Sequence, residues 1–93
     1  MTIGILRLSL FIHNSGSLKE KRMVLNSLKT RLRNAFNVSV AEIDTEDKWQ
    51  KATLAVVGVG KSKDNLNSCL SDIVNYIDGI SAIHLINYEM EMI

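Results

Sequence analysis

Residues 2–20, which read TIGILRLSLFIHNSGSLKE, decide the fold because a strand pattern changes to a helix start within one short turn. Leucine or isoleucine at positions 6, 8, 10 and 12 alternates with a second set at positions 5, 7, 9 and 11. This period of two predicts a β-strand over residues 2–12. Ser17 and Glu20 then have the spacing of a capping box, in which Ser17 caps a helix and Glu20 reaches back to the Ser17 amide.

The segment that follows is predicted to be a helix to about Phe36. Its apolar residues recur at spacings that form one buried stripe, and they are Leu18, Leu25, Leu28, Leu32 and Phe36. Residues 38–43 and 51–59 are β-branched runs, which predict two strands, the second one central in the sheet. The acidic turn at residues 44–47 between them favours an antiparallel hairpin.

The last third of the chain repeats the helix–strand order. Ser62 or Asp64 can cap a second helix, and Gly79 can end it. Its buried stripe is predicted to contain Leu66, Leu70, Ile73 and Ile77. Residues 82–92 alternate again and predict a final strand. The order βαββαβ favours an α+β, ferredoxin-like sandwich with a four-stranded antiparallel sheet and both helices on one face.

That architecture leaves the second face of the sheet uncovered. On the first strand this face carries Ile3, Ile5 and Phe11. Because an exposed apolar surface of this size usually marks an interface, we predict a homodimer or a partner contact through these residues.

The bulk composition bounds the class of protein. The chain has 93 residues, 46% hydrophobic and 23% charged, which is typical of a single globular domain spanning residues 1–93. A single cysteine, Cys69, excludes an internal disulfide, and we interpret it as a small core residue. The apolar start has no basic leader, and the longest apolar run, residues 52–60, is too short to cross a bilayer. We therefore expect a cytoplasmic protein without a membrane partner.

The charges are polarised, although the net charge is only +1. Residues 1–36 contain seven lysines and arginines against Glu20 alone, whereas residues 37–47 contain four acidic residues and no base. Lys19, Lys21 and Arg22 lie at the positive end of the helix dipole, where cations are unfavourable and anions bind. We interpret them as an anion or nucleic-acid site that Lys29, Arg31 and Arg33 extend along the helix. The alternative is a solvated face that keeps the protein soluble.

The other candidate sites carry weaker signals. The loop at residues 13–17 could cradle a phosphate, but it has neither phosphate-binding glycine fingerprint. The acidic stretch, Glu42, Asp44, Glu46 and Asp47, could bind a divalent cation or could form a solvated hairpin tip. Trp49 is interpreted as a packing anchor. Neither histidine has a partner at ligand spacing, and no nucleophilic constellation is present, so we expect no metal, no cofactor and no catalytic residues.

Several segments resemble the YlxP-like family of small bacterial proteins, a domain family without an assigned function. These segments are residues 4–7 (GILR), 17–22 (SLKEKR), 36–42 (FNVSVAE) and 49–52 (WQKA). The resemblance implies a ferredoxin-like fold and dimerisation. The family's genes commonly sit among genes for transcription and translation-initiation factors, which implies a role related to the ribosome or RNA. Residues 13–16 depart from the proline-containing loop associated with the family, so the resemblance does not extend to that loop.

Three functions follow, in order of preference. The first is a non-enzymatic accessory protein that binds RNA or a ribosomal particle through the basic first helix. The second is a sensor or enzyme for a phosphorylated metabolite or nucleotide, at the corner from His13 to Arg22. The third is a protein-interaction module that uses the open sheet face.

Overall fold

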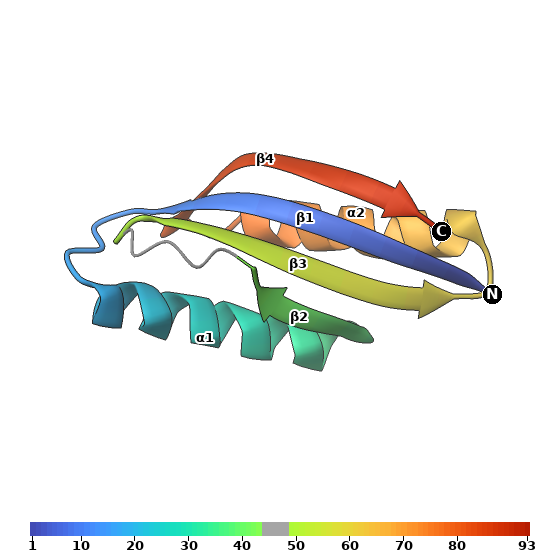
Figure 1. Ribbon diagram of the computed structural model, residues 1–93, viewed down its shortest axis with the longest axis horizontal. Helices are drawn as coiled ribbons and strands as arrows, with labels where there is room; N and C mark the ends of the chain where they lie inside the picture. Colours follow the sequence, from blue (N-terminus) through green and yellow to red (C-terminus); the bar gives the residue numbers. More distant parts are fainter. Residues whose placement is uncertain (44–48) are drawn as a thin grey trace.

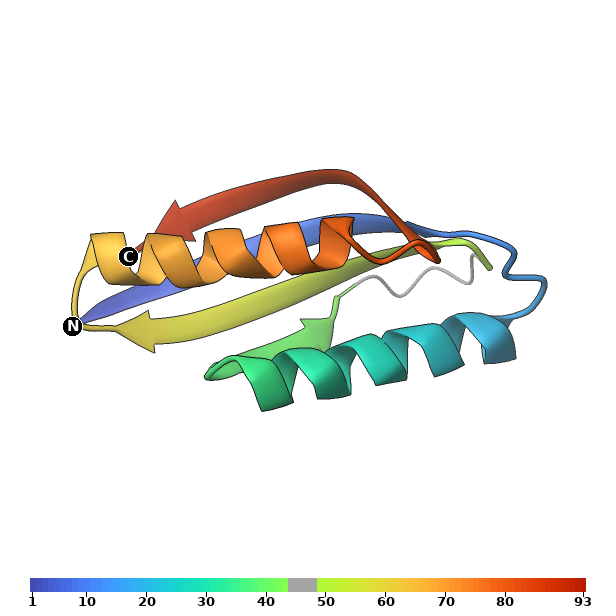
Figure 2. The same cartoon turned by 180° about the vertical axis from the view of Figure 1, so that it is seen from behind.

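The computed structural model describes residues 1–43 and 49–93 and has the predicted βαββαβ order. Its elements are β1 (Thr2–Ile12), α1 (Leu18–Ala35), β2 (Val38–Glu42), β3 (Lys51–Gly60), α2 (Lys63–Asp78) and β4 (Ile83–Met92). The strands form one antiparallel sheet in the order β2-β3-β1-β4 (Figure 1). Both helices lie on the same side of this sheet, as Figure 2 shows from behind. The predicted fold class is confirmed.

The core lies between this face of the sheet and the two helices. Leu6, Leu8, Leu10 and Ile12 of β1 have no exposed surface, as their alternation predicted. The helices close the core with Leu25, Leu28 and Leu32 from α1, and with Leu66, Leu70, Ile73 and Ile77 from α2. Burial of each such side chain contributes roughly 1.5–3 kcal/mol. Two residues predicted for the α1 stripe, Leu18 and Phe36, are only half-buried, because each lies at an end of the helix.

Two glycines allow α2 to pack closely on the sheet. Gly4 of β1 pairs with Gly58 of β3, and both lie beneath Leu66 of α2. A β-carbon on Gly4 would lie 2.7 Å from Leu66 Cδ2 and 2.9 Å from Leu70 Cδ1. Since real β-carbon contacts are longer, the absence of a side chain at Gly4 sets how near the helix can come.

A serine side chain caps the N-terminus of each helix. Ser17 Oγ accepts the Glu20 N–H at 3.1 Å, and Ser62 Oγ accepts the Asn65 N–H at 3.2 Å, so Ser62 rather than Asp64 caps α2. The Glu20 carboxylate accepts the N–H of Gly16 at 2.7 Å, one residue before the amide predicted for it. The start of α1 is therefore held by its own side chains.

The acidic stretch predicted to bind a cation or to form a solvated tip is described only in part. Glu42 is the last residue of β2 and is half-buried. Asp44, Glu46 and Asp47 lie outside the described residues.

Candidate nucleic-acid interface

Four basic residues of α1 lie on one flank of the helix, in a row that we call the basic stripe: Lys19, Arg22, Lys29 and Arg33. At 3.6 residues per turn these positions lie within about 80° of the helix circumference, and they extend over about 21 Å. Lys19, Arg22 and Arg33 are exposed, and Lys29 is half-buried. The stripe therefore presents a line of positive charge on one flank of the helix.

Lys21 does not belong to this surface, although the sequence interpretation included it. Only 4% of its surface is exposed, and its Nζ donates to the Lys51 carbonyl oxygen at 3.1 Å. Its position four and seven residues before Leu25 and Leu28 places it on the buried side of the helix. Lys21 is thus a structural link between α1 and the start of β3.

Arg31 is exposed but faces another direction. Its position on the helix is about 160° from the centre of the basic stripe. Its Nε lies 3.5 Å from the Ser27 carbonyl oxygen, one helical turn earlier. A ligand that contacts the basic stripe would not reach Arg31, so the predicted basic face divides into the stripe, one buried lysine and one arginine on the opposite flank.

The last residue of the stripe is tied to the sheet. Arg33 Nη2 donates to the Val40 carbonyl oxygen of β2 at 2.6 Å. Its guanidinium is partly committed to this bond, which fixes the end of α1 beside β2. The stripe consequently runs along the side of the molecule that carries the free edge of β2.

At the loop between β1 and α1, which the sequence offers as a phosphate site, backbone amides already donate to side chains of the protein itself. The Gly16 amide donates to Glu20, and the Glu20 amide donates to Ser17. Beside this loop is a hollow of about 270 Å³, lined by Ile12, His13, Asn14, Ser15, Glu20, Met23 and Val24. Glu20 contributes a negative charge to its wall, which disfavours a phosphate group.

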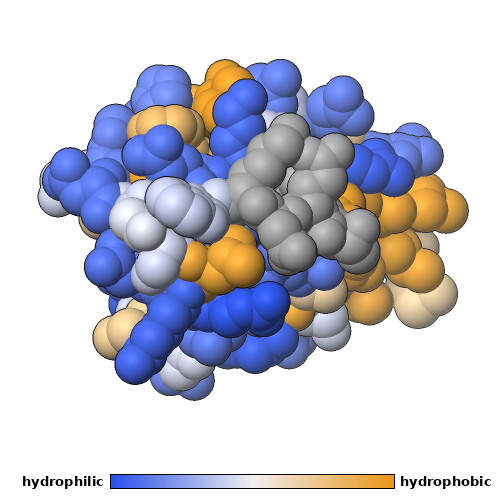
Figure 3. Space-filling model, turned by 60° about the vertical axis from the view of Figure 1, so that its left-hand side comes forward, coloured by the Kyte–Doolittle hydropathy of each residue, from blue (hydrophilic) through white to orange (hydrophobic). Residues whose placement is uncertain are grey.

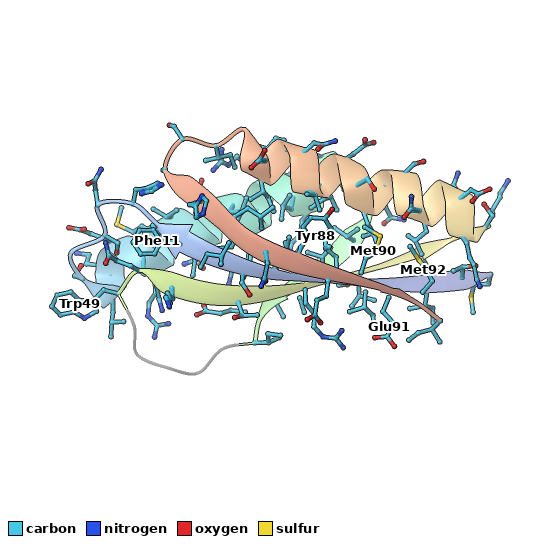
Figure 4. The ribbon with its side chains drawn as sticks, turned by 90° about the horizontal axis from the view of Figure 1, so that it is seen from above. Phe11, Trp49, Tyr88, Met90, Glu91 and Met92 are labelled. Atoms are coloured by element: carbon cyan, nitrogen blue, oxygen red, sulfur yellow. The ribbon has the colours of Figure 1, made fainter. Side chains whose placement is uncertain are left out.

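Aromatic side chains gather at the end of the sheet where β1 ends, a group we call the aromatic end: Phe11, His13, Trp49 and His84. The Phe11 and His13 rings are 5.4 Å apart at 72°, and the His13 and His84 rings are 6.4 Å apart. Figure 4 shows Phe11 and Trp49 at this same end. Trp49 is 57% exposed, so its interpretation as a packing anchor is wrong. The sequence interpretation missed the proximity of Phe11 and His84, because only the β1–β4 register places them opposite each other.

The uncovered face of the sheet has an apolar corner at its opposite end: Ile3, Ile5, Val57 and Val59. Ile3 opposes Val59 and Ile5 opposes Val57 in the β1–β3 register. Figure 3 shows apolar side chains, in orange, gathered along the right-hand margin of the view. Phe11, which the sequence placed in the same interface, lies at the aromatic end instead.

Cys69 lacks the features of a reactive thiol. It lies on α2, half-buried against the core. Burial raises the pKa of the Cys69 thiol, and the nearby Asp72 carboxylate raises it further. The thiol is therefore protonated at neutral pH, in agreement with its interpretation as a packing residue.

The described residues contain neither a membrane-spanning helix nor a cluster of metal ligands. No helix in residues 1–43 and 49–93 is long and apolar enough to cross a membrane. Within the same residues, no three histidine, cysteine, aspartate or glutamate side chains lie close enough together to hold a metal ion.

Solved structures with a similar fold have very different sequences. The structured domain of Drosophila melanogaster Boca superposes with a TM-score of 0.60 at 11% identity, over 94% of this chain and 95% of that one. A variant of SnoaB, a cofactor-independent oxygenase from Streptomyces nogalater, superposes with a TM-score of 0.52 at 13% identity, over 99% and 90%. At these identities the likeness shows the fold alone.

Sequence comparison places this chain in a known protein family. The uncharacterized protein YlxP of Bacillus subtilis (strain 168) is 37% identical over 81 residues, which cover 87% of this chain and 88% of the relative. The family model described as a protein of unknown function (DUF503) matches residues 3–90. The chain therefore belongs to the DUF503 family and is a YlxP-like protein.

Proposed function

We propose that this protein is a non-enzymatic accessory protein that binds RNA, free or in a ribosomal particle, along the basic stripe of α1. The observation that carries the proposal is the alignment of Lys19, Arg22, Lys29 and Arg33 on one flank over about 21 Å. A row of cations of this kind binds a phosphate backbone by releasing its counterions, without reading the base sequence.

The aromatic end supports the same proposal. β1 ends at Ile12 and α1 begins at Leu18, so the aromatic end lies beside the Lys19 end of the stripe (Figure 1). Unpaired bases stack on exposed aromatic side chains, and this stacking tolerates any base. Single-stranded RNA can therefore place its backbone on the stripe and one or two bases on Trp49 or His84, both of which are exposed.

The triple variant Lys19→Ala, Arg22→Ala, Lys29→Ala is expected to bind single-stranded RNA about tenfold more weakly at 150 mM salt. Arg33 is kept because its bond to Val40 supports β2. The slope of the logarithm of the binding constant against the logarithm of salt concentration should fall by about 2, since each lost contact removes about 0.7 of a released counterion. Filter binding of a labelled oligonucleotide between 50 and 200 mM salt measures both quantities.

A matched variant controls for the total charge. Arg31→Ala, Lys61→Ala, Lys63→Ala also removes three positive charges, all from exposed positions outside the stripe. It should retain the affinity of the parent to within about twofold. If the two triple variants bind equally, the stripe has no special role and the proposal is wrong.

We also propose that the protein forms a homodimer through the apolar corner of the sheet. Val57 and Val59 are 37% and 58% exposed, although both lie in a regular strand. Apolar side chains that leave water on association stabilise a dimer, and Ile3 and Ile5 widen this patch on β1.

Sedimentation equilibrium tests the dimer. The parent should sediment at twice its chain mass of 10.4 kDa, and Val59→Lys should shift it to one chain mass, because a charge would be buried in the contact. Met23→Lys, at an exposed apolar position on α1, should leave the mass unchanged. A parent that remains monomeric at millimolar concentration would contradict the dimer.

A phosphorylated small ligand at the corner from His13 to Arg22 has less support. The Gly16 amide is occupied by Glu20, and Lys21 is turned into the protein. A panel of nucleotides and phosphorylated metabolites separates this alternative from RNA binding, because a ligand that binds only the folded state raises Tm.

A further inference from the structure

The sheet has two edge strands, β2 and β4, and the edge of β2 is protected from pairing with another strand. β2 has only five residues. Ile43 N–H bonds to the Thr53 carbonyl, so by the alternation of an antiparallel ladder the backbone groups of Val38 and Val40 point away from β3. Arg33 donates to the Val40 carbonyl, and the Val38 N–H bonds to the Phe36 carbonyl. A short strand with its outer groups already bonded is a poor template for another strand.

The edge formed by β4 is open. β4 has ten residues, and Ile3 and Ile93 exchange hydrogen bonds of 3.3 and 2.7 Å just beyond its end. In an antiparallel ladder, residues whose backbone groups face the partner strand alternate with residues whose groups face away. Because Ile93 faces β1, the backbone N–H and C=O groups of Tyr88, Met90 and Met92 point away from β1. In the described part of the chain, no hydrogen bond reaches these outward groups. The register shift of β4 is confined to the region opposite Ser9 and Leu10, so residues 87–92 form a regular edge.

The side chains along this edge form two chemically distinct rows. Tyr88, Met90 and Met92 lie on the α2 side of β4, and Glu91 lies on the opposite side (Figure 4). Tyr88 is 49% exposed, while Met90 and Met92 are half-buried against the core. Glu89 shares the face of Glu91 and is exposed. The Glu91 carboxylate already pairs with Arg7 of β1, with Arg7 Nη1 3.4 Å from Glu91 Oε2, so Glu89 is the carboxylate of this row left to attract a basic segment. An apolar row and an acidic row therefore flank one set of unpaired backbone groups.

We propose that the outer edge of β4, residues 87–92, is a docking site for an extended segment of another protein in which apolar residues alternate with lysine or arginine. Such a segment would add a fifth strand and bond to the backbone of Tyr88, Met90 and Met92. Its apolar side chains would pack against the two methionines, which adapt readily to different shapes. Its basic side chains would lie on the face that carries Glu89 and Glu91, where opposite charges fix the register.

Charge also decides against a second copy of this chain as the occupant. Two β4 strands paired antiparallel about a two-fold axis would place Glu89 and Glu91 of both copies in one row on the same face. Like charges on neighbouring strands destabilise the pairing. A basic segment turns the same row into an attraction.

The probe is an acetylated and amidated eight-residue peptide that alternates valine and lysine, mixed with the 93-residue chain. We expect the backbone amides of Tyr88, Met90 and Met92 to shift in NMR spectra and to become protected from exchange with solvent. A peptide that alternates valine and glutamate should bind at least tenfold more weakly. Absence of binding at millimolar peptide would overturn the proposal, as would shifts confined to another surface.

Two variants locate the contact. Met90→Pro removes an N–H that points away from β1, and an edge strand tolerates proline at such a position. The variant should keep its fold by circular dichroism and lose peptide binding at least tenfold. Glu89→Lys keeps the backbone intact and should reverse the preference toward the valine–glutamate peptide. Unchanged binding by both variants would refute the site. Protection of the β4 amides that depends on protein concentration in the absence of peptide would also refute it, because the occupant would then be a second copy of the chain.

Discussion

Lys21→Glu is expected to lower the free energy of unfolding by about 3 kcal/mol. Lys21 is 4% exposed, and its ammonium group donates to the Lys51 carbonyl oxygen. A glutamate there would bury a carboxylate that cannot donate to a carbonyl oxygen, and would leave both groups without a partner. Urea unfolding followed by circular dichroism measures the change.

Arg22→Glu provides the matched control, because it makes the same change of charge at the next residue, which is exposed. Its free energy of unfolding should differ from that of the parent by no more than about 0.5 kcal/mol. Equal losses in the two variants would mean that the net charge, rather than the buried contact with Lys51, determines the effect.

Gly4→Ala is expected to destabilise the protein by about 2 kcal/mol, since overpacking a well-filled core costs about 1–3 kcal/mol. The added methyl group would lie 2.7 Å from Leu66 Cδ2 and 2.9 Å from Leu70 Cδ1. Either α2 moves away from β1 or the two leucines leave their preferred rotamers, and both responses cost packing energy. The same urea titration detects the loss.

Gly16→Ala separates this steric effect from the general effect of adding a methyl group. At Gly16 the nearest atom to an added β-carbon is Glu20 Oε2 at 3.7 Å, an ordinary contact. The substitution should change the free energy of unfolding by less than about 0.5 kcal/mol. If Gly4→Ala changes the free energy of unfolding as little as Gly16→Ala does, then the space between Gly4 and Leu66 accommodates a methyl group, and the steric argument is wrong.

The order of the elements could be predicted from the sequence because the apolar period changes sharply from strand to helix. The alternation in β1 and the leucine spacing in α1 correspond directly to the buried faces. β4 was harder to interpret, because one bulge changes which residues share a face. Beyond the bulge the register opposes His84 to Phe11 on the uncovered face, while Leu85 opposes Leu10 on the core face.

The candidate site could be predicted only in part. The concentration of cations on the first helix is visible in the sequence, but charge alone does not say which cations reach the surface. The helical phase of Lys21, four residues before Leu25, was the signal that could have identified it as buried. The aromatic end and the unequal edges depend on which strands become neighbours, and no local pattern encodes that.

The exposure of Trp49 determines what can be learned from the intrinsic fluorescence of this protein. It is the only tryptophan in the chain, and more than half of its surface is in contact with water in the folded state. Its emission will already resemble that of an unfolded chain, so the usual red shift will barely register denaturation. The same indole should respond strongly when a nucleobase stacks on it, which makes it a built-in reporter of occupancy at that end of the sheet.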